Sequence, residues 1–168
     1  LDTDLPWLDR VVADCGARVI AGHSYGALLA LRWALAHPGR LERLVLCEPI
    51  AWGIAHGHSG VDARLRELDE CLARFAAGDV EAGMRWLVDY WNGEGFWQKL
   101  PGKVRDALLA GSARTRAEVA CGSADRTHEA ELAQLEVPTL LLAGAATTAE
   151  SLSVARRLGR CIPGARVI

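Results

Sequence analysis

The sequence predicts an α/β fold, with a mostly parallel sheet, flanking helices and one all-helical insertion. Three short apolar runs are predicted to be strands, because each is too brief for a helix and is bounded by polar or turn residues: Val19–Ala21, Leu44–Cys47 and Thr139–Ala143. From about residue 62 to residue 133 the apolar residues recur at helical spacing and no convincing strand is present. A predicted helix separates the first two runs. A strand–helix–strand connection of this kind implies parallel strands with a right-handed crossover.

Helices are predicted on both sides of the first strand, which is expected to be buried. The segment Asp2–Cys15 carries an apolar stripe at helical spacing, and Asp4 is a candidate cap for it. The segment from Ala27 to about His37 is apolar nearly all round, which predicts a buried helix.

The first strand and the second helix are joined by the pentapeptide Gly22-His23-Ser24-Tyr25-Gly26. This is the G-x-S-x-G pattern of a nucleophile elbow, a sharp turn that exposes a strained serine at its apex. Neighbours without a Cβ keep the strand and the helix from colliding. The Tyr25 N–H lies at a helix N-terminus, where it can donate to a developing oxyanion. His23 is expected to position or pack the elbow. The simpler interpretation is a joint in which Ser24 only caps the helix.

In this context the pentapeptide resembles the elbow of the α/β-hydrolase superfamily. Leu41–Pro49 is similar to the strand that follows the elbow helix in that family, and Val137–Gly144 is similar to a later strand that usually delivers an acid. The resemblance implies a partial α/β-hydrolase fold with a serine nucleophile and a helical lid. We expect residues 1–51 and 136–168 to belong to the core and 52–135 to form the lid. Complete members of the family are longer on both sides, so we expect an interior fragment.

The resemblance offers more than one place for the acid of the catalytic residues. The usual place is a Gly-x-x-Asp pattern after the later strand, but the matching stretch here ends in Thr147, which cannot carry the charge. Some members, the haloalkane dehalogenases among them, carry the acid one strand earlier, where Glu48 stands. We expect Glu48 to be the acid, with Glu150 as a second candidate. The alternative for Glu48 is a structural carboxylate at a strand end.

The base in this family is a histidine after the last strand, which begins only as the sequence ends. The histidines downstream of the elbow are expected to be surface or lid residues: His37, His56, His58 and His128. Residues 52–60, after Glu48-Pro49, are predicted to be a loop, and its two histidines, His56 and His58, are candidate substrate contacts. A second oxyanion donor is expected upstream of Leu1. We therefore expect this segment alone to be inactive.

An aromatic cluster lies in the insertion and is a candidate wall of the substrate pocket. Its members, with one tryptophan just after the second strand, are Trp52, Trp86, Tyr90, Trp91 and Trp97. The alternative is that these residues form the core of the lid, which at helical spacing suits at least Trp86 better.

Composition limits the classes of function. The net charge of −2 argues against a general nucleic-acid binder, and no apolar run reaches the ~18 residues of a membrane span. The five cysteines are scattered without C-x-x-C spacing, which disfavours a zinc site or a disulfide framework and favours a cytoplasmic protein. We expect no metal and no cofactor. Nothing in the sequence indicates the oligomeric state.

These observations favour a serine hydrolase that acts on an ester, thioester or similar acyl bond of a small, largely apolar molecule. Carbon–carbon bond hydrolases and cofactor-free haloperoxidases resemble the same pattern. The alternative from another class is a non-catalytic binding protein that retains the fold and has lost its triad, which Thr147 at the usual acid position motivates.

Overall fold

A computed structural model describes residues 1, 3–57 and 59–168. Asp2, the first residue of the earliest predicted helix, and His58, a candidate substrate contact, lie outside the described residues.

Within the described residues the sheet has four parallel strands in the order β1-β2-β3-β4. They are β1 (Val19–His23), β2 (Arg43–Cys47), β3 (Thr139–Leu142) and β4 (Arg166–Val167). The predicted parallel pairing of the three apolar runs is confirmed, with Gly22 opposite Leu46 and Leu46 opposite Leu141. All carboxyl ends therefore lie at one edge of the sheet.

The helix after β1 is buried, as its all-round apolar pattern predicts. It is α2 (Tyr25–Ala36), and Leu28, Leu31 and Trp33 have no exposed surface. It packs against β1, β2 and the preceding helix α1 (Asp4–Cys15). Asp4 does not cap α1; Thr3 takes the N-cap position, and the Asp4 carboxylate instead accepts a hydrogen bond from the Tyr25 hydroxyl at 2.5 Å.

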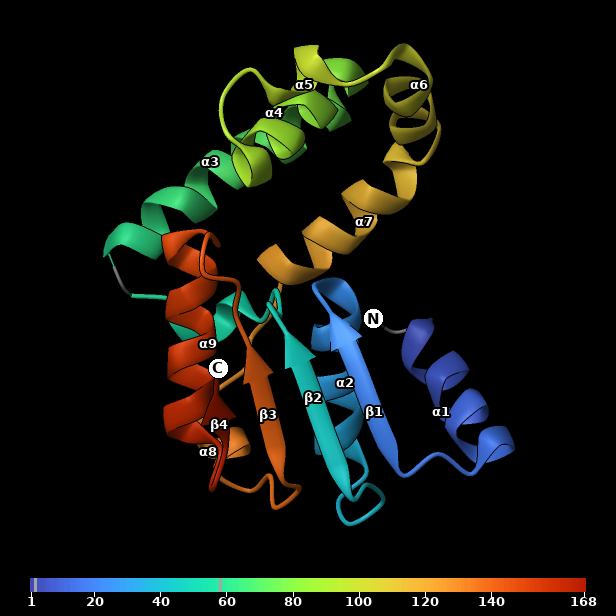
Figure 1. Ribbon diagram of the computed structural model, residues 1–168, viewed down its shortest axis with the longest axis vertical. Coiled ribbons are helices and arrows are strands. Elements are labelled where there is room, and N and C mark those ends of the chain that lie inside the picture. Colours follow the sequence, from blue (N-terminus) through green and yellow to red (C-terminus); the bar gives the residue numbers. More distant parts are fainter. Residues whose placement is uncertain (2, 58) are drawn as a thin grey trace.

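The segment between β2 and β3 is helical throughout its regular parts and crosses above the carboxyl ends of the strands (Figure 1). Its elements are η1 (Trp52–Ala55), α3 (Ser59–Ala76), α4 (Val80–Asn92), α5 (Phe96–Lys99), α6 (Gly102–Ala110), α7 (Ser112–Ser123) and α8 (Glu129–Leu132). Helices α3 and α4 pack so closely that a Cβ on Gly83 would lie 2.7 Å from the Phe75 ring. We call α3–α7 the lid.

The core resumes with β3, followed by α9 (Ala149–Cys161), which packs against β3, β4 and η1. The Thr148 hydroxyl accepts a hydrogen bond from the Ser151 N–H and so caps α9. No helix of the described residues is long and apolar enough to cross a membrane.

Two sequence predictions need correction. The first strand is not buried, because β1 pairs only with β2 in the described sheet, and Val19 is 52% exposed. The segment after Glu48-Pro49, predicted to be a loop, forms η1, in which Trp52 and Ile54 are buried. Its turn is held by the Gly53 N–H, which donates to the buried Asp125 carboxylate at 3.0 Å.

Candidate active site

The turn between β1 and α2 has the backbone geometry of a sharp elbow. Ser24 lies between them with φ 53° and ψ −118°, a conformation that side-chain-bearing residues rarely adopt. The Ser24 N–H donates to the Cys47 carbonyl of β2 at 2.9 Å, which fixes the turn against the neighbouring strand. Ser24 makes no side-chain cap hydrogen bond to α2, so the simpler capping interpretation lacks its defining contact.

The two glycines of the pentapeptide have different roles. A Cβ on Gly22 would lie 2.3 Å from the Gly26 carbonyl oxygen, so only glycine fits where strand and helix approach. A Cβ on Gly26 would meet no described atom within 4 Å. The expectation that both glycines prevent a collision therefore holds for Gly22 and not, among the described residues, for Gly26.

Glu48 occupies the corresponding position at the end of the adjacent strand. It directly follows β2 and has a positive φ of 44°. Its N–H donates to the Leu142 carbonyl at 3.0 Å, and its Oε1 accepts a hydrogen bond from the Gly144 N–H at 2.8 Å. The Glu48 carboxylate thus links the end of β2 to the loop after β3. A hydrogen bond from a backbone N–H to an ionised carboxylate is a strong one.

Ser24 and Glu48 line one cavity of about 410 Å³ at the carboxyl edge of the sheet. Its other lining residues come from the elbow, the lid and the loop after β3: His23, Trp91, Gly144, Ala146, Thr147 and Thr148. This volume lies within the range of small-molecule sites, and the carboxyl edge of a parallel sheet is where such sites form.

The second acid candidate does not reach this cavity. Glu150 lies in the first turn of α9, its side chain is 16% exposed, and its Oε1 is 3.4 Å from Arg64 Nε of the lid. It lines a different, small cavity between lid and core. Of the two carboxylates, the geometry brings only Glu48 to Ser24.

Of the predicted aromatic wall, Trp91 alone lines the cavity with Ser24. Trp52, Trp86 and Tyr90 line the small cavity beside Glu150, and Trp52 also packs on Gly122 of α7. Trp97 is 2% exposed and belongs to the hydrophobic core. These four residues therefore lie away from the cavity that Ser24 lines. Within α4, successive positions point to different sides, so Tyr90 and Trp91 line different cavities.

The described histidines differ in their position relative to the Ser24 cavity. His37 ends α2, stacks on Trp33 at 4.3 Å and pairs with Asp9, far along the helix from Ser24. His56 lies 3.9 Å from Asp62 at the start of the lid, and His128 begins α8. His23 is exposed and lines the cavity beside Ser24, so it is not packed into the core.

Tyr25 contributes its backbone and its side chain separately. As the first residue of α2 it carries one of the N–H groups that a helix leaves without an internal partner, beside the Ser24 hydroxyl. Its phenol is buried and donates to Asp4, and burial first, then this hydrogen bond, raises the pKa of Tyr25 well above its usual value. The side chain therefore ties α1 to α2 and stays neutral.

Metal binding has no candidate site in the described part of the chain, where no three or more His, Cys, Asp and Glu side chains are grouped to hold an ion. The residues that line the cavity supply hydroxyls, the Glu48 carboxylate, the His23 imidazole and backbone donors.

Comparison with known proteins identifies the family. The sequence model described as "Alpha/beta hydrolase family" matches residues 2–167, almost the whole chain. The chain belongs to the alpha/beta hydrolase family. No curated protein matches it in sequence.

Solved structures share the alpha/beta hydrolase fold of this chain. A hydrolase from Pseudomonas aeruginosa is 25% identical with a TM-score of 0.65, and the match covers 98% of this chain and 61% of the hydrolase. A bromoperoxidase from Bacillus anthracis is 15% identical with a TM-score of 0.68, and the match covers 99% of this chain and 64% of the bromoperoxidase. An esterase from Exiguobacterium antarcticum is 17% identical with a TM-score of 0.67, covering 98% and 62%. This alpha/beta hydrolase chain thus spans about three fifths of their length.

Sequence analysis missed some lining residues of the alpha/beta hydrolase cavity. Gly144, Ala146 and Thr148 line it together with Thr147, which the sequence marked only as the wrong residue for an acid. The available signal was their position directly after a predicted parallel strand, where loops converge on the carboxyl edge.

Proposed function

We propose that the protein containing this chain is a serine hydrolase that cleaves an ester, thioester or similar acyl bond through an acyl-enzyme on Ser24. The observation that carries the proposal is the convergence of Ser24 and Glu48, both with positive φ, on one cavity at the ends of adjacent strands. A strained backbone conformation persists only where the surrounding structure enforces it, and such residues cluster at functional sites.

In the proposed reaction Ser24 Oγ attacks the acyl carbon while a base takes its proton. The Tyr25 N–H donates to the oxyanion that forms. The alcohol or thiol leaves with the proton, and water then releases the acid from Ser24. Glu48 is proposed to hold the base in the correct tautomer and to stabilise its charged form, as the acid of a catalytic triad does.

The base is proposed to be the histidine that follows the last strand in the family pattern. His37, His56 and His128 are engaged away from the cavity. His23 lines the same cavity but immediately precedes the nucleophile in the chain, at the end of β1. The role proposed for His23 is to border the substrate.

The substrate is proposed to be small, because the cavity of about 410 Å³ suits a molecule of modest size. Trp91 and Ala146 supply apolar wall, in keeping with a largely apolar acyl group, while Thr147 and Thr148 add hydroxyls near one side. The esterase and the bromoperoxidase among the similar structures are each below 25% identity and share the fold only. A carbon–carbon bond hydrolase or a haloperoxidase remains the alternative within the enzyme class.

The test is covalent labelling of the complete protein with a fluorophosphonate probe, followed by mapping of the modified peptide. We expect the label on Ser24 and its loss in Ser24→Ala. A matched control is Ser112→Ala, at the start of α7 and away from the cavity, which should label like the wild type. Labelling of Ser24→Ala at the wild-type level would falsify the assignment.

A non-catalytic binding protein is the second candidate, because Thr147 stands where the family usually has its acid and lines the cavity. The same experiment separates the two. A binding protein would leave Ser24 unlabelled while small esters still shift its thermal unfolding.

A further inference from the structure

One edge of the candidate cavity is formed jointly by the lid and the core. Trp91 of α4 and Thr148 at the start of α9 both line it. The residue before Trp91 contacts the core directly: the Tyr90 hydroxyl lies 3.5 Å from Thr148 Oγ1. The two rings also touch, with the Tyr90 and Trp91 centroids 4.4 Å apart and nearly perpendicular. The position of the Trp91 ring therefore depends on where Tyr90 is held.

Arg64 of α3 adds a charged link at the same place. Its guanidinium lies over the Tyr90 ring, 5.1 Å from the centroid, a cation–π arrangement. Its Nε is 3.4 Å from Glu150 Oε1 of α9, and it also pairs with Glu67 on its own helix. Arg64 thus joins two lid helices to the first turn of a core helix.

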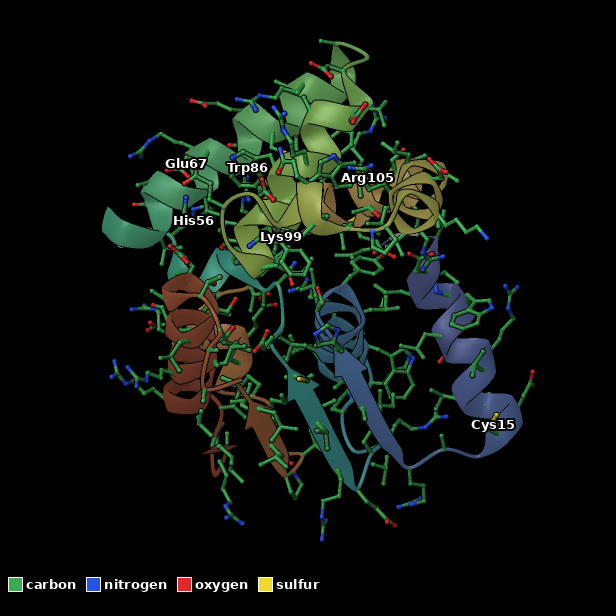
Figure 2. The ribbon with its side chains drawn as sticks, turned by 45° about the horizontal axis from the view of Figure 1, so that its top comes forward. Cys15, His56, Glu67, Trp86, Lys99 and Arg105 are labelled. Atoms are coloured by element: carbon green, nitrogen blue, oxygen red, sulfur yellow. The ribbon has the colours of Figure 1, made fainter. Side chains whose placement is uncertain are left out.

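This link is an ion pair that is partly shielded from solvent. The Glu150 side chain is 16% exposed and that of Arg64 is 42% exposed, and with Tyr90 they line the small cavity between lid and core. Trp86 stacks on Tyr90 one helical turn earlier, at 5.2 Å. Figure 2 labels Glu67 and Trp86, which come from the neighbouring lid helices α3 and α4.

We propose that Arg64, Glu150 and the Tyr90–Thr148 contact fasten the lid to the core and hold Trp91 in the wall of the Ser24 cavity. Arg64 and Glu150 are then positioning residues that determine how well a substrate is bound, and Trp91 is the residue through which they act. The part of the proposal that concerns substrate rests on the proposed function. The fastening itself does not.

The loop after β3 connects this fastening to the catalytic groups. Glu48 Oε1 holds the Gly144 N–H at one end of the loop, and the Thr148 hydroxyl caps α9 at the other. Loosening the lid at Tyr90 therefore changes the wall of the cavity while Glu48 stays attached to Gly144. This separation predicts an effect on substrate binding and little effect on the chemical step.

The test compares Glu150→Gln with Glu67→Gln in the complete protein. Glu150→Gln removes the charge that crosses from core to lid, whereas Glu67→Gln removes only the pair within α3 and is the matched control. With p-nitrophenyl butyrate we expect Glu150→Gln to raise KM roughly two- to fivefold, the range for one partly exposed ion pair, with kcat nearly unchanged. Glu67→Gln should leave both constants as in the wild type.

Amide hydrogen exchange supplies a measurement that does not need activity. We expect faster exchange over residues 80–92 in Glu150→Gln and wild-type exchange there in Glu67→Gln. Because Glu150 also interacts with the N-terminus of α9, the single variant Arg64→Met and the double variant are needed as well: the effect of the double variant should be smaller than the sum of the two single effects. Unchanged exchange over residues 80–92, or additive effects, would overturn the proposal. Failure of Ser24 to label would instead reject the proposed function and leave the exchange result valid.

Discussion

Ser24 and Glu48 directly follow two residues that lie opposite each other in the sheet, His23 at the end of β1 and Cys47 at the end of β2. Both have positive φ, 53° and 44°, and among the described non-glycine residues they are the two that do. Adjacent parallel strands that end together place the following residues side by side, which is why a serine and a carboxylate 24 positions apart in number line one cavity.

The first prediction concerns the acid. Glu48→Gln keeps the shape and removes the charge that is proposed to orient and stabilise the base, so the rate of fluorophosphonate labelling at Ser24 should fall about 10²- to 10⁴-fold. The control is Glu42→Gln, whose carboxylate pairs with Arg18 before β2 begins. A labelling rate within a factor of about two of the wild type would assign Glu48 a structural role.

The second prediction tests whether the cavity accepts an acid from the next strand. Thr147 lines the same cavity and sits at the position where the family usually carries an aspartate. Adding Thr147→Asp to Glu48→Gln should therefore restore part of the lost labelling rate. The comparison variant is Glu48→Gln with Thr147→Asn, which has the same shape without charge and should restore nothing. Equal rates for the two double variants would show that this position cannot serve the base.

The third prediction separates the two elbow glycines. Gly22→Ala forces a Cβ against the Gly26 carbonyl, a backbone atom that cannot move aside, and should lower the free energy of unfolding by about 3 kcal/mol. Gly26→Ala meets open space within α2 and should be neutral or stabilising by up to about 1 kcal/mol. Urea denaturation of both variants measures the difference. The idea fails if both substitutions destabilise equally.

The fourth prediction is a pH dependence of stability at Tyr25. Because the folded-state pKa of Tyr25 is raised above the unfolded value of about 10, its contribution is complete below that pH and is lost as the pH rises further. Tyr25→Phe should lower the free energy of unfolding by about 1 kcal/mol at pH 7 and flatten its decline above pH 10. Burial also raises the pKa of Tyr90, which keeps part of the slope.

Urea unfolding of wild type and Tyr25→Phe between pH 7 and about pH 11 measures both effects. Labelling of Ser24 should persist in Tyr25→Phe, since the backbone N–H proposed for the oxyanion is unchanged. An alkaline slope identical to that of the wild type would contradict the role of the phenol.

Much of the fold follows from local pattern. The strands β1, β2 and β3 and the long helices α2, α3 and α4 agree with prediction, because their apolar residues recur with the period of the element they form. The short elements η1, α5 and α8 were not predicted, since single helical turns are stabilised by tertiary contacts. In η1 the contact is from Gly53 to Asp125, 72 residues later.

The elbow and the position of its serine could be predicted from five consecutive residues, because the strand, the turn and the helix there are determined by local sequence. The parallel direction of the strands and the helical character of the lid came from pattern in the same way. That Glu150 lines a different cavity from Ser24, and that Trp91 is the member of the aromatic cluster beside Ser24, required the folded chain. Each depends on contacts between distant segments, Glu48 with Gly144 96 residues later and Tyr90 with Thr148 58 residues later. The periodicity of apolar residues indicates which face of a helix or strand is buried. It carries no information on which distant element packs against that face.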